Sequence, residues 1–289
     1  MAIVDLSGAV DIHIHSNPSL FPRIGSDVEI AQHAADHGLA AILLKNHFES
    51  TVGRAFQADK IVEGTLVFGG LVLNHFTGGL NPVAVEHAIR LGAKKIWMPT
   101  IDALGHVKAF GHSGGYGYQE SGSKIHYKGI TILDEAGNIK EEVKVIVNLV
   151  KENDIMLGTA HLSRNEIFSL ASFSKKEGFK KLVITHPYFE PPKLSVKDQV
   201  GLAQMGASIE MCGGNLYPIP GVAKLSDYLT TITEVDTNSL IISSDSGQPR
   251  KSMPAEVLRV FTQCLMDKGV SQEQINTMTK TNPIKSLGL

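Results

Sequence analysis

The fold is decided near the start of the chain, where one short apolar run reads Val10-Asp11-Ile12-His13-Ile14-His15. Successive side chains of a β-strand point to opposite faces, so His13 and His15 share one face. An apolar strand this close to the N-terminus is expected to be buried, which disfavours two solvent-facing histidines on an edge strand. Two imidazoles on one rigid strand can bind a single ion, and imidazole suits Zn, Fe, Ni and Mn.

Runs of the same kind recur along the chain, and segments with helical periodicity follow most of them. The further runs are 40–47, 66–74, 95–100, 155–161, 181–186, 207–211 and 240–245, and the helical segments include 27–37, 81–91, 141–151, 166–176, 197–205 and 254–268. Continuous apolar runs indicate parallel strands that are buried on both faces. Eight such strands predict a closed (β/α)₈ barrel formed by residues 1–289 as one domain, a fold that takes about 250 residues. A doubly wound open sheet would also alternate, but it would not explain where the polar residues lie.

Several predicted strands end in a histidine or a carboxylate. In a (β/α)₈ barrel these C-terminal strand ends form the active-site face. We therefore expect a metal site built from distant segments, with His13, His15, His161, His186 and Asp245 as ligands. The structural alternatives are satisfied core histidines at 161 and 186 and a helix N-cap at Asp245.

This order of residues resembles the amidohydrolase superfamily, in which the first strand carries His-x-His, the fifth and sixth strands a histidine each, and the eighth an aspartate. The pair Asn282-Pro283 also resembles the usual close of that group. The resemblance implies one or two divalent ions, with zinc ahead of Mn, Fe or Ni. It also implies hydrolysis of an amide, cyclic amide, lactone or phosphoester in a small molecule, with Asp245 as the proton carrier.

Lys45 departs from the superfamily pattern. Many amidohydrolases carry a carboxylated lysine on strand four, but here that strand ends Trp97-Met98-Pro99-Thr100. Lys45 instead shares the inward face of the second predicted strand with His47, and a lysine there is expected to be paired, neutral or modified. We predict a catalytic role as an anion contact or electrophile, with a relocated carbamate as the alternative.

Weaker candidates complete the predicted site. His47 and His75 are candidate metal ligands or pocket residues, Glu210 is a candidate ligand or proton carrier, and Arg23 is predicted to bind a substrate carboxylate or phosphate. Residues 101–140 are predicted to form an insertion after strand four that covers the site as a lid, with a hairpin at 131–140. No role can be assigned from the sequence to the three histidines of this insertion, His106, His112 and His126.

Three other functions remain open at this level. The start of the chain and Leu44-Lys45-Asn46-His47 resemble the PHP phosphoesterases, although such a chain should end in Asp-x-His and this one reads Asp245-Ser246-Gly247. A lyase or decarboxylase could use the same metal barrel. A non-catalytic metal-binding barrel would lack a proton carrier, so Asp245 argues against it.

The composition narrows the class of protein further. A net charge of -2 without a basic cluster gives no reason to expect nucleic acid. The sequence has two cysteines, no basic leader and no apolar run of about 18 residues. We therefore expect a cytoplasmic protein without a membrane segment. A homo-oligomer is left open.

Overall fold

The computed structural model describes residues 3–116, 120–123, 125, 127–216 and 223–289. It is an α/β fold with two parallel sheets, one with the strand order β1-β2-β3 and one with the order β4-β5-β6-β7-β8-β9. The strands are β1 (Val10–His15), β2 (Ala41–Lys45), β3 (Leu66–Phe68), β4 (Gly70–Val72), β5 (Lys95–Trp97), β6 (Met156–Gly158), β7 (Leu182–Thr185), β8 (Ser208–Cys212) and β9 (Leu240–Ser243).

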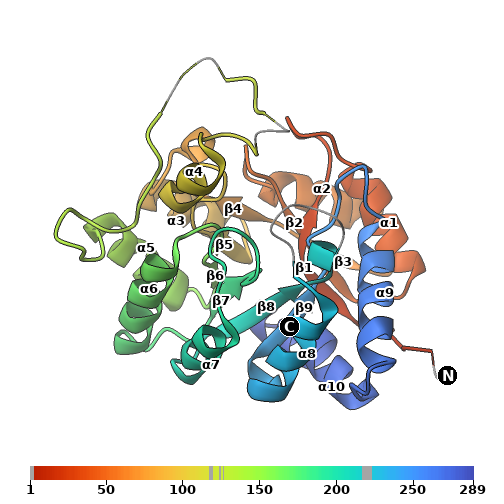
Figure 1. Ribbon diagram of the computed structural model, residues 1–289. Coiled ribbons are helices and arrows are strands. Elements are labelled where there is room, and N and C mark those ends of the chain that lie inside the picture. The colour runs from red at the N-terminus through yellow and green to blue at the C-terminus, as the bar shows by residue number, and fades with distance from the viewer. Residues whose placement is uncertain (1–2, 117–119, 124, 126, 217–222) are drawn as a thin grey trace.

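The helices lie around the outside of the strands (Figure 1). They are α1 (Asp27–Asp36), α2 (Val52–Ile61), α3 (Pro82–Arg90), α4 (Leu104–Phe110), α5 (Glu141–Glu152), α6 (Arg164–Lys176), α7 (Val196–Gln204), α8 (Leu225–Glu234), α9 (Pro254–Met266), α10 (Gln272–Asn276) and α11 (Asn282–Leu287). Short helical turns η1 (His75–Thr77), η2 (Gly213–Leu216), η3 (Thr237–Ser239) and η4 (Thr277–Thr281) connect some of them. None of the described helices is long and apolar enough to cross a membrane.

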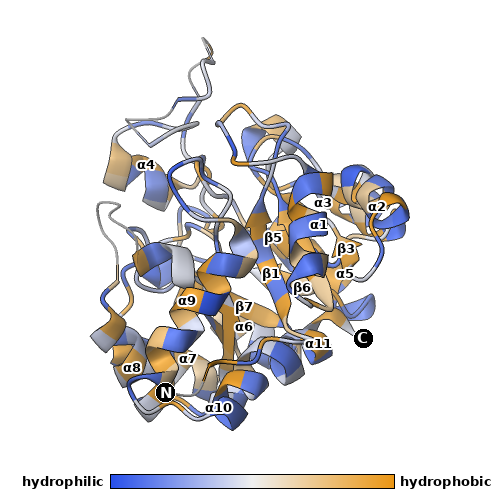
Figure 2. Ribbon diagram, turned by 90° about the vertical axis from the view of Figure 1, so that its right-hand side faces the viewer, coloured by the Kyte–Doolittle hydropathy of each residue, from blue (hydrophilic) through white to orange (hydrophobic). Residues whose placement is uncertain are grey.

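Apart from β3, where Leu66 is exposed, the strands are largely buried, as their apolar runs predict. Every residue of β1, β2 and β9 is buried, and the large side chain of Trp97 in β5 is fully enclosed. Figure 2 shows mainly apolar residues on the strands and mixed apolar and polar residues on the surrounding helices. Burial of apolar surface on both faces of the sheets is therefore the main term that stabilises the fold.

The predicted third strand is divided into β3 and β4 at Gly69. A side-chain Cβ at this position would lie 2.5 Å from the carbonyl oxygen of Thr51, so only glycine allows the approach. Thr51 is also hydrogen-bonded to the first residue of β4: its N–H donates to the Gly70 carbonyl over 3.0 Å. This contact with a distant segment explains why one apolar run gives two strands.

The first and last strands meet at the edge that carries the predicted site. The N–H of Asp245 donates to the carbonyl of His13 over 3.0 Å, and the N–H of His15 donates to the carbonyl of Ser246 over 2.8 Å. These bonds lie beyond the last residue of β9, and the ladders form two sheets rather than one closed ring. The closed barrel therefore stays a prediction.

The segment between β5 and α5 contains the short helix α4. Ile130 is bridged to the start of this helix, since its N–H donates to Asp102 and its carbonyl accepts from Leu104. Leu133 and Ile139 form an antiparallel bridge at the position of the predicted hairpin. Residues 117–119, 124 and 126 of the predicted lid, including His126, lie outside the described residues.

Candidate active site

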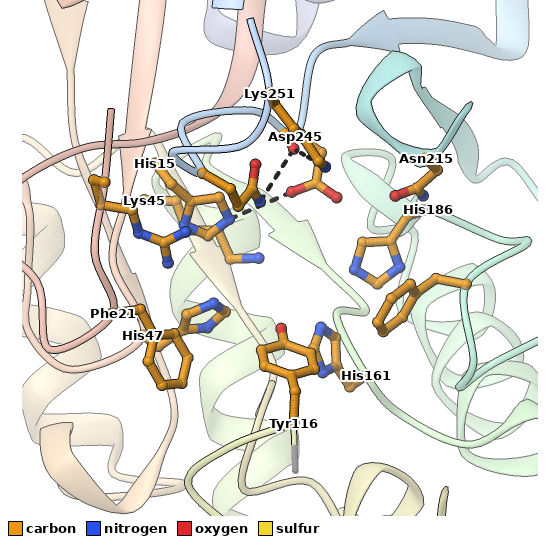
Figure 3. A pocket seen from close by; sticks show the side chains of 13 residues that line it. His15, Phe21, Lys45, His47, Tyr116, His161, His186, Asn215, Asp245 and Lys251 are labelled. Atoms are coloured by element: carbon orange, nitrogen blue, oxygen red, sulfur yellow. Dashed lines mark hydrogen bonds and ion pairs between the residues drawn. The ribbon is translucent and has the colours of Figure 1, made fainter. Parts of the chain in front are cut away.

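One pocket lies at the C-terminal ends of the strands, the face on which a (β/α)₈ protein carries its active site. Its cavity measures about 50 Å³. A single water molecule needs about 10–15 Å³, so the cavity holds several. The lining residues are His15, Phe21, Arg23, Lys45, His47, Tyr116, His161, His186, Phe189, Asn215, Asp245, Gln248 and Lys251 (Figure 3).

Three of the predicted ligands converge in this region. Oδ1 of Asp245 lies 3.2 Å from Nε2 of His13 and 3.3 Å from Nε2 of His15. Ligand atoms of these three residues all lie within 4.8 Å of one another, and all three residues are buried. Burial opposes ionisation of Asp245, but His13, His15 and Lys251 hold the pKa of its carboxyl well below the usual range.

The tautomer of His13 follows from the residues behind it. Oε1 of Glu210 lies 3.1 Å from Nδ1 of His13 and also accepts from the Ser243 hydroxyl over 2.8 Å. Burial raises the pKa of Glu210, but the ammonium of Lys95, 3.1 Å from Oε2, and His13 lower it well below its usual range. An ionised carboxylate only accepts, so Nδ1 of His13 carries a proton. Burial, followed by the charge of Lys45, lowers the pKa of His13, so the ring is neutral and its Nε2 presents a lone pair.

This tautomer places two acceptors opposite each other, because the lone pair of His13 Nε2 faces Oδ1 of Asp245 at 3.2 Å. Such an approach is stable only beside a cation. The amine of Lys45 is one such group, since its Nζ lies 2.9 Å from His13 Nε2. Two imidazole nitrogens and a carboxylate oxygen are also a donor set that suits a divalent transition metal. The residues present therefore fit a metal ion.

A second group of ligand atoms lies behind His13, where Glu210 and Cys212 approach its other ring nitrogen. Lys95 already pairs with Glu210, and Sγ of Cys212 is 4.0 Å from His13 Nδ1. Burial, followed by the charges of Glu210 and Asp245, raises the pKa of the Cys212 thiol well above its usual value. A protonated thiol and a paired carboxylate make this group a support for His13 rather than a second metal site.

His161 and His186 line the same pocket, with ring centroids 5.1 Å apart. Within the described part of the chain, neither belongs to a set of three ligand atoms that all lie within 4.8 Å. Nδ1 of His186 is buried without a hydrogen-bond partner among the described residues. Burial is the first cause that lowers the pKa of His186, to about 3, so its ring is neutral and can offer a lone pair.

A chain of hydrogen bonds also fixes the tautomer of His161. Nε2 of His106 donates to the carbonyl oxygen of Gly115 over 2.7 Å, because a carbonyl can only accept. Burial lowers the pKa of His106 to about 4, so the neutral ring has an acceptor at Nδ1. This Nδ1 lies 2.9 Å from Nδ1 of His161, which must donate. Burial and the neighbouring histidines also lower the pKa of His161, so its Nε2 is left as a lone pair.

The backbone is strained at the strand ends that carry these side chains. Asp245, His186 and Ala160, which precedes His161, have φ values of 46°, 32° and 49°. Residues with a side chain rarely adopt this left-handed region, and such strain is concentrated at functional sites. The turns therefore aim the side chains in a direction that a regular strand end would not give.

The remaining predicted residues divide between the pocket and its surroundings. Arg23, Lys45 and His47 line the pocket, and Lys45 pairs with His15 across the β1–β2 ladder. The pocket placement predicted for His75 is wrong: η1 turns this side chain outward, where its Nε2 bonds to the Lys128 carbonyl over 2.9 Å. Glu210, the candidate ligand or proton carrier, does not line the pocket, and its Oε1 lies 3.1 Å from Nδ1 of His13.

Two alternatives from the sequence are excluded by the structure. Asp245 is not a helix cap, because α9 begins at Pro254 and its N-cap is Met253. The histidine that a PHP-like Asp-x-His would place at position 247 has no room. A Cβ on Gly247 would lie 1.8 Å from the carbonyl oxygen of His15, and this glycine has a φ of 125°.

The sequence prediction missed the buried polar residues Lys95, His106 and Lys251, and also Phe21, Phe189 and Asn215, which line the pocket. Lys95 could have been found, since it alternates with the inward Trp97 at the start of an apolar strand. In the sequence, His106 is marked only by the glycine that precedes it. An added Cβ on Gly105 would lie 3.0 Å from the carbonyl oxygen of His161. No local pattern marks Lys251, which reaches the pocket from the loop before α9.

The fold and site together define an α/β protein with parallel sheets and a histidine- and carboxylate-lined pocket at the strand ends. Residues 8–210, more than half of the chain, match a family model described as a family of unknown function (DUF6282), and the chain belongs to that family. No curated protein matches the sequence.

Solved structures of similar fold cover nearly the whole chain. The probable dipeptidase PvdM from Pseudomonas aeruginosa has a TM-score of 0.64 at 13% identity, over 97% of this chain and 94% of that one. Dipeptidase AC, described as a metallopeptidase, has a TM-score of 0.64 at 10% identity, over 97% and 98%. The organophosphorus hydrolase from Deinococcus radiodurans has a TM-score of 0.61 at 12% identity, over 98% and 93%.

These structural neighbours are of the amidohydrolase kind that the order of ligands resembles, and at these identities the likeness shows the fold alone. The resemblance to PHP phosphoesterases finds no support among them.

Proposed function

We propose that the protein is a metal-dependent hydrolase that acts on a small molecule. The observation that carries the proposal is the convergence of His13 Nε2, His15 Nε2 and Asp245 Oδ1 on one side of the pocket. Two of these atoms are acceptors that face each other and require a cation between or beside them. The fold shared with a metallopeptidase and an organophosphorus hydrolase is consistent with this chemistry.

His13, His15 and Asp245 would hold the first ion, and His161 and His186 would complete its ligands or contribute to a second. A bound divalent ion supplies an activated water at neutral pH and polarises the bond to be cleaved. Asp245 would take a proton from the attacking water and pass it to the leaving group. Its lowered pKa keeps the carboxylate ionised.

Lys45 and Arg23 would serve the substrate. Burial lowers the pKa of Lys45 to about 8, while the charges of Asp245 and Glu210 oppose that shift. Its Nζ would contact an oxygen of the substrate once an ion pairs with His13. A carbamate on Lys45 is the alternative. His47, which lines the pocket, would add a further metal ligand.

The proposal extends to the closure of the fold, the metal, the location of the protein and the bond that is cleaved. We infer a closed (β/α)₈ barrel, zinc as the first choice of metal, a cytoplasmic location, and residues 101–140 as a cover for the pocket. The scissile bond would be an amide, cyclic amide, lactone or phosphoester. The organophosphorus hydrolase and the dipeptidases among the structural neighbours are consistent with this range.

Elemental analysis of protein purified without chelator tests the metal site. We expect at least about half an equivalent of transition metal, and loss of that metal from the His13→Ala/His15→Ala variant. A matched control removes two exposed histidines outside the pocket, His75 and His87, and should keep its metal. Full metal in the His13/His15 variant would refute the ligand assignment.

The reaction type needs a second measurement. Metal-loaded enzyme should hydrolyse members of a panel of small amides, lactones and phosphoesters, with ¹⁸O from labelled water in one product. Turnover without ¹⁸O incorporation would indicate a lyase or decarboxylase. A folded, metal-loaded protein with no turnover on any member would favour a metal-binding barrel without catalysis.

A further inference from the structure

The pocket has an excess of positive charge. Among the described residues that line it, Arg23, Lys45 and Lys251 are cationic and Asp245 alone is anionic. All three cationic residues are buried, with exposed fractions of 8%, 1% and 7%. Burying a charge is costly unless a partner of opposite sign compensates it. A metal ion bound by Asp245 would add to this excess instead of cancelling it.

Arg23 and Lys251 both line the pocket, and we call this pair the cationic wall. The charge of Arg23 lowers the pKa of Lys251, after the larger effects of burial, Asp245 and Cys212. Lys251 donates to the backbone carbonyl of Asp245 over 3.3 Å and forms no ion pair with a carboxylate of the described residues. An ammonium has three N–H donors, so this single carbonyl leaves donors for a ligand.

The position of Lys251 is built into the surrounding backbone. It lies against Gly214, where an added Cβ would be 2.8 Å from the Lys251 nitrogen and 2.7 Å from the Asp245 carbonyl oxygen. The N–H of Gly214 in turn donates to the Ser244 carbonyl over 2.7 Å. The segment after β8 thus holds the ammonium at the same strand end as Asp245.

Aromatic rings line the same cavity, and Arg23 lies over one of them, with its Cζ 5.8 Å from the ring centroid of Phe21. Figure 3 shows Lys251 and Asp245 on one side, with Phe21 and Tyr116 on the opposite side. The rings of Phe21 and Tyr116 are 5.9 Å apart, and Tyr116 also lies 6.3 Å from Phe189. The pocket therefore offers positive charge next to aromatic surface, which suits an anion that carries an apolar or aromatic body.

We propose that the substrate is a small organic acid, whose carboxylate or phosphate binds the cationic wall of Arg23 and Lys251 while its apolar body packs on Phe21, Tyr116 and Phe189. This inference rests on the proposed hydrolase and narrows its substrate class. The planar guanidinium of Arg23 matches an oxyanion in two-point geometry, and Lys251 adds a point charge. The acid group would thereby hold the scissile bond next to the metal ligands.

Isothermal titration calorimetry with benzoate and benzamide tests the proposal, because the two molecules share size and shape but differ in charge. Benzoate should bind the protein at least about tenfold more tightly than benzamide, the gain of a charge-assisted hydrogen bond. Phenyl phosphate, measured in parallel, tells a phosphate site from a carboxylate site by which of the two anions binds more tightly. Each titration is made on zinc-loaded and on chelator-treated protein.

Arg23→Gln and Lys251→Gln should each weaken benzoate binding by about tenfold. Arg90→Gln and Lys60→Gln remove the same charges at exposed positions outside the pocket and should change it less than about twofold. Circular dichroism checks folding, and if buried Arg23 does not tolerate the change, Lys251→Gln decides alone. Equal binding of benzoate and benzamide, no benzoate binding at all, or full binding by the pocket variants would overturn the proposal.

The metal content of each sample separates this proposal from the hydrolase itself. Benzoate binding that depends on Lys251, in a protein that takes up no zinc when zinc is supplied, supports the cationic wall and refutes the metal-dependent function. Benzoate binding only in zinc-loaded protein, unchanged by both pocket variants, means that the anion binds the ion alone. That result overturns the cationic wall and leaves the hydrolase standing.

Discussion

Replacing Glu210 by Gln should destabilise the protein far more than the same replacement at the surface. Glu210 and Lys95 are completely buried and 3.1 Å apart, and the carboxylate also accepts from His13 and Ser243. The Gln oxygen can still accept from His13 and Ser243. Its amide group would face Lys95, however, and leave a buried ammonium without a counter-charge.

Breaking a buried ion pair on one side typically costs about 3–5 kcal/mol. For a chain of 289 residues, an unfolding entropy of about 2.1 cal/mol/K per residue converts this cost into a fall in Tm of about 5–8 °C. The double variant Lys95→Met/Glu210→Gln removes both charges and should recover most of the loss. A matched surface change, Glu256→Gln in the exposed pair with Arg259, should cost less than about 1 kcal/mol.

Urea unfolding in chelator, followed by circular dichroism, measures all of these variants without a contribution from metal binding. A Glu210→Gln variant within about 1 kcal/mol of wild type would show that the buried pair does not hold two charges. A double variant as unstable as Glu210→Gln alone would place the cost in the packing around Glu210 instead. Either result would also remove the argument for the tautomer of His13.

Three further predictions concern the pocket. Asp245→Asn should fold and keep most of its metal while kcat falls by about 10²–10⁴-fold; near wild-type turnover would rule out the proton carrier. Lys45→Met should lose activity but bind metal at least as well in elemental analysis, because the amine beside His13 competes with an ion; loss of metal would make a Lys45 carbamate the ligand. Burial lowers the pKa of His106 to about 4, so the unfolded chain takes up its proton first as pH falls below about 6.5. In urea unfolding with chelator, lowering the pH from 6.5 to 5 should therefore cost His106→Gln about 1.6 kcal/mol less stability than wild type, and equal losses would contradict a buried neutral ring.

Local patterns predicted the strands and the polar ends of several of them. The bounds of β1 agree with its apolar run, and each of β6, β7 and β9 ends one to three residues before the histidine or aspartate that the sequence singled out. Period-2 alternation and continuous apolar character are properties of a few adjacent residues, so they can be read without the rest of the chain. The α/β character of the fold followed from them.

Contacts between distant segments could not be predicted in this way. The division of the third predicted strand depends on Thr51 against Gly69, and the burial of His106 depends on His161, 55 residues away. His75 follows the end of β4 much as other site residues follow their strands, yet the turn η1 directs it to solvent. In each case the deciding interaction lies outside any local sequence window.

Two chains of hydrogen bonds fix the tautomers of two histidines at the site. Glu210, supported by Lys95, fixes the proton of His13 on Nδ1, and His106, bonded to Gly115, fixes that of His161 on Nδ1. Both chains leave the Nε2 lone pair, the form that a metal ion requires. The second chain begins at a backbone carbonyl within residues 101–140. A shift of this segment would release His106 and with it the tautomer of His161, so the segment that borders the pocket also sets the state of one of its histidines.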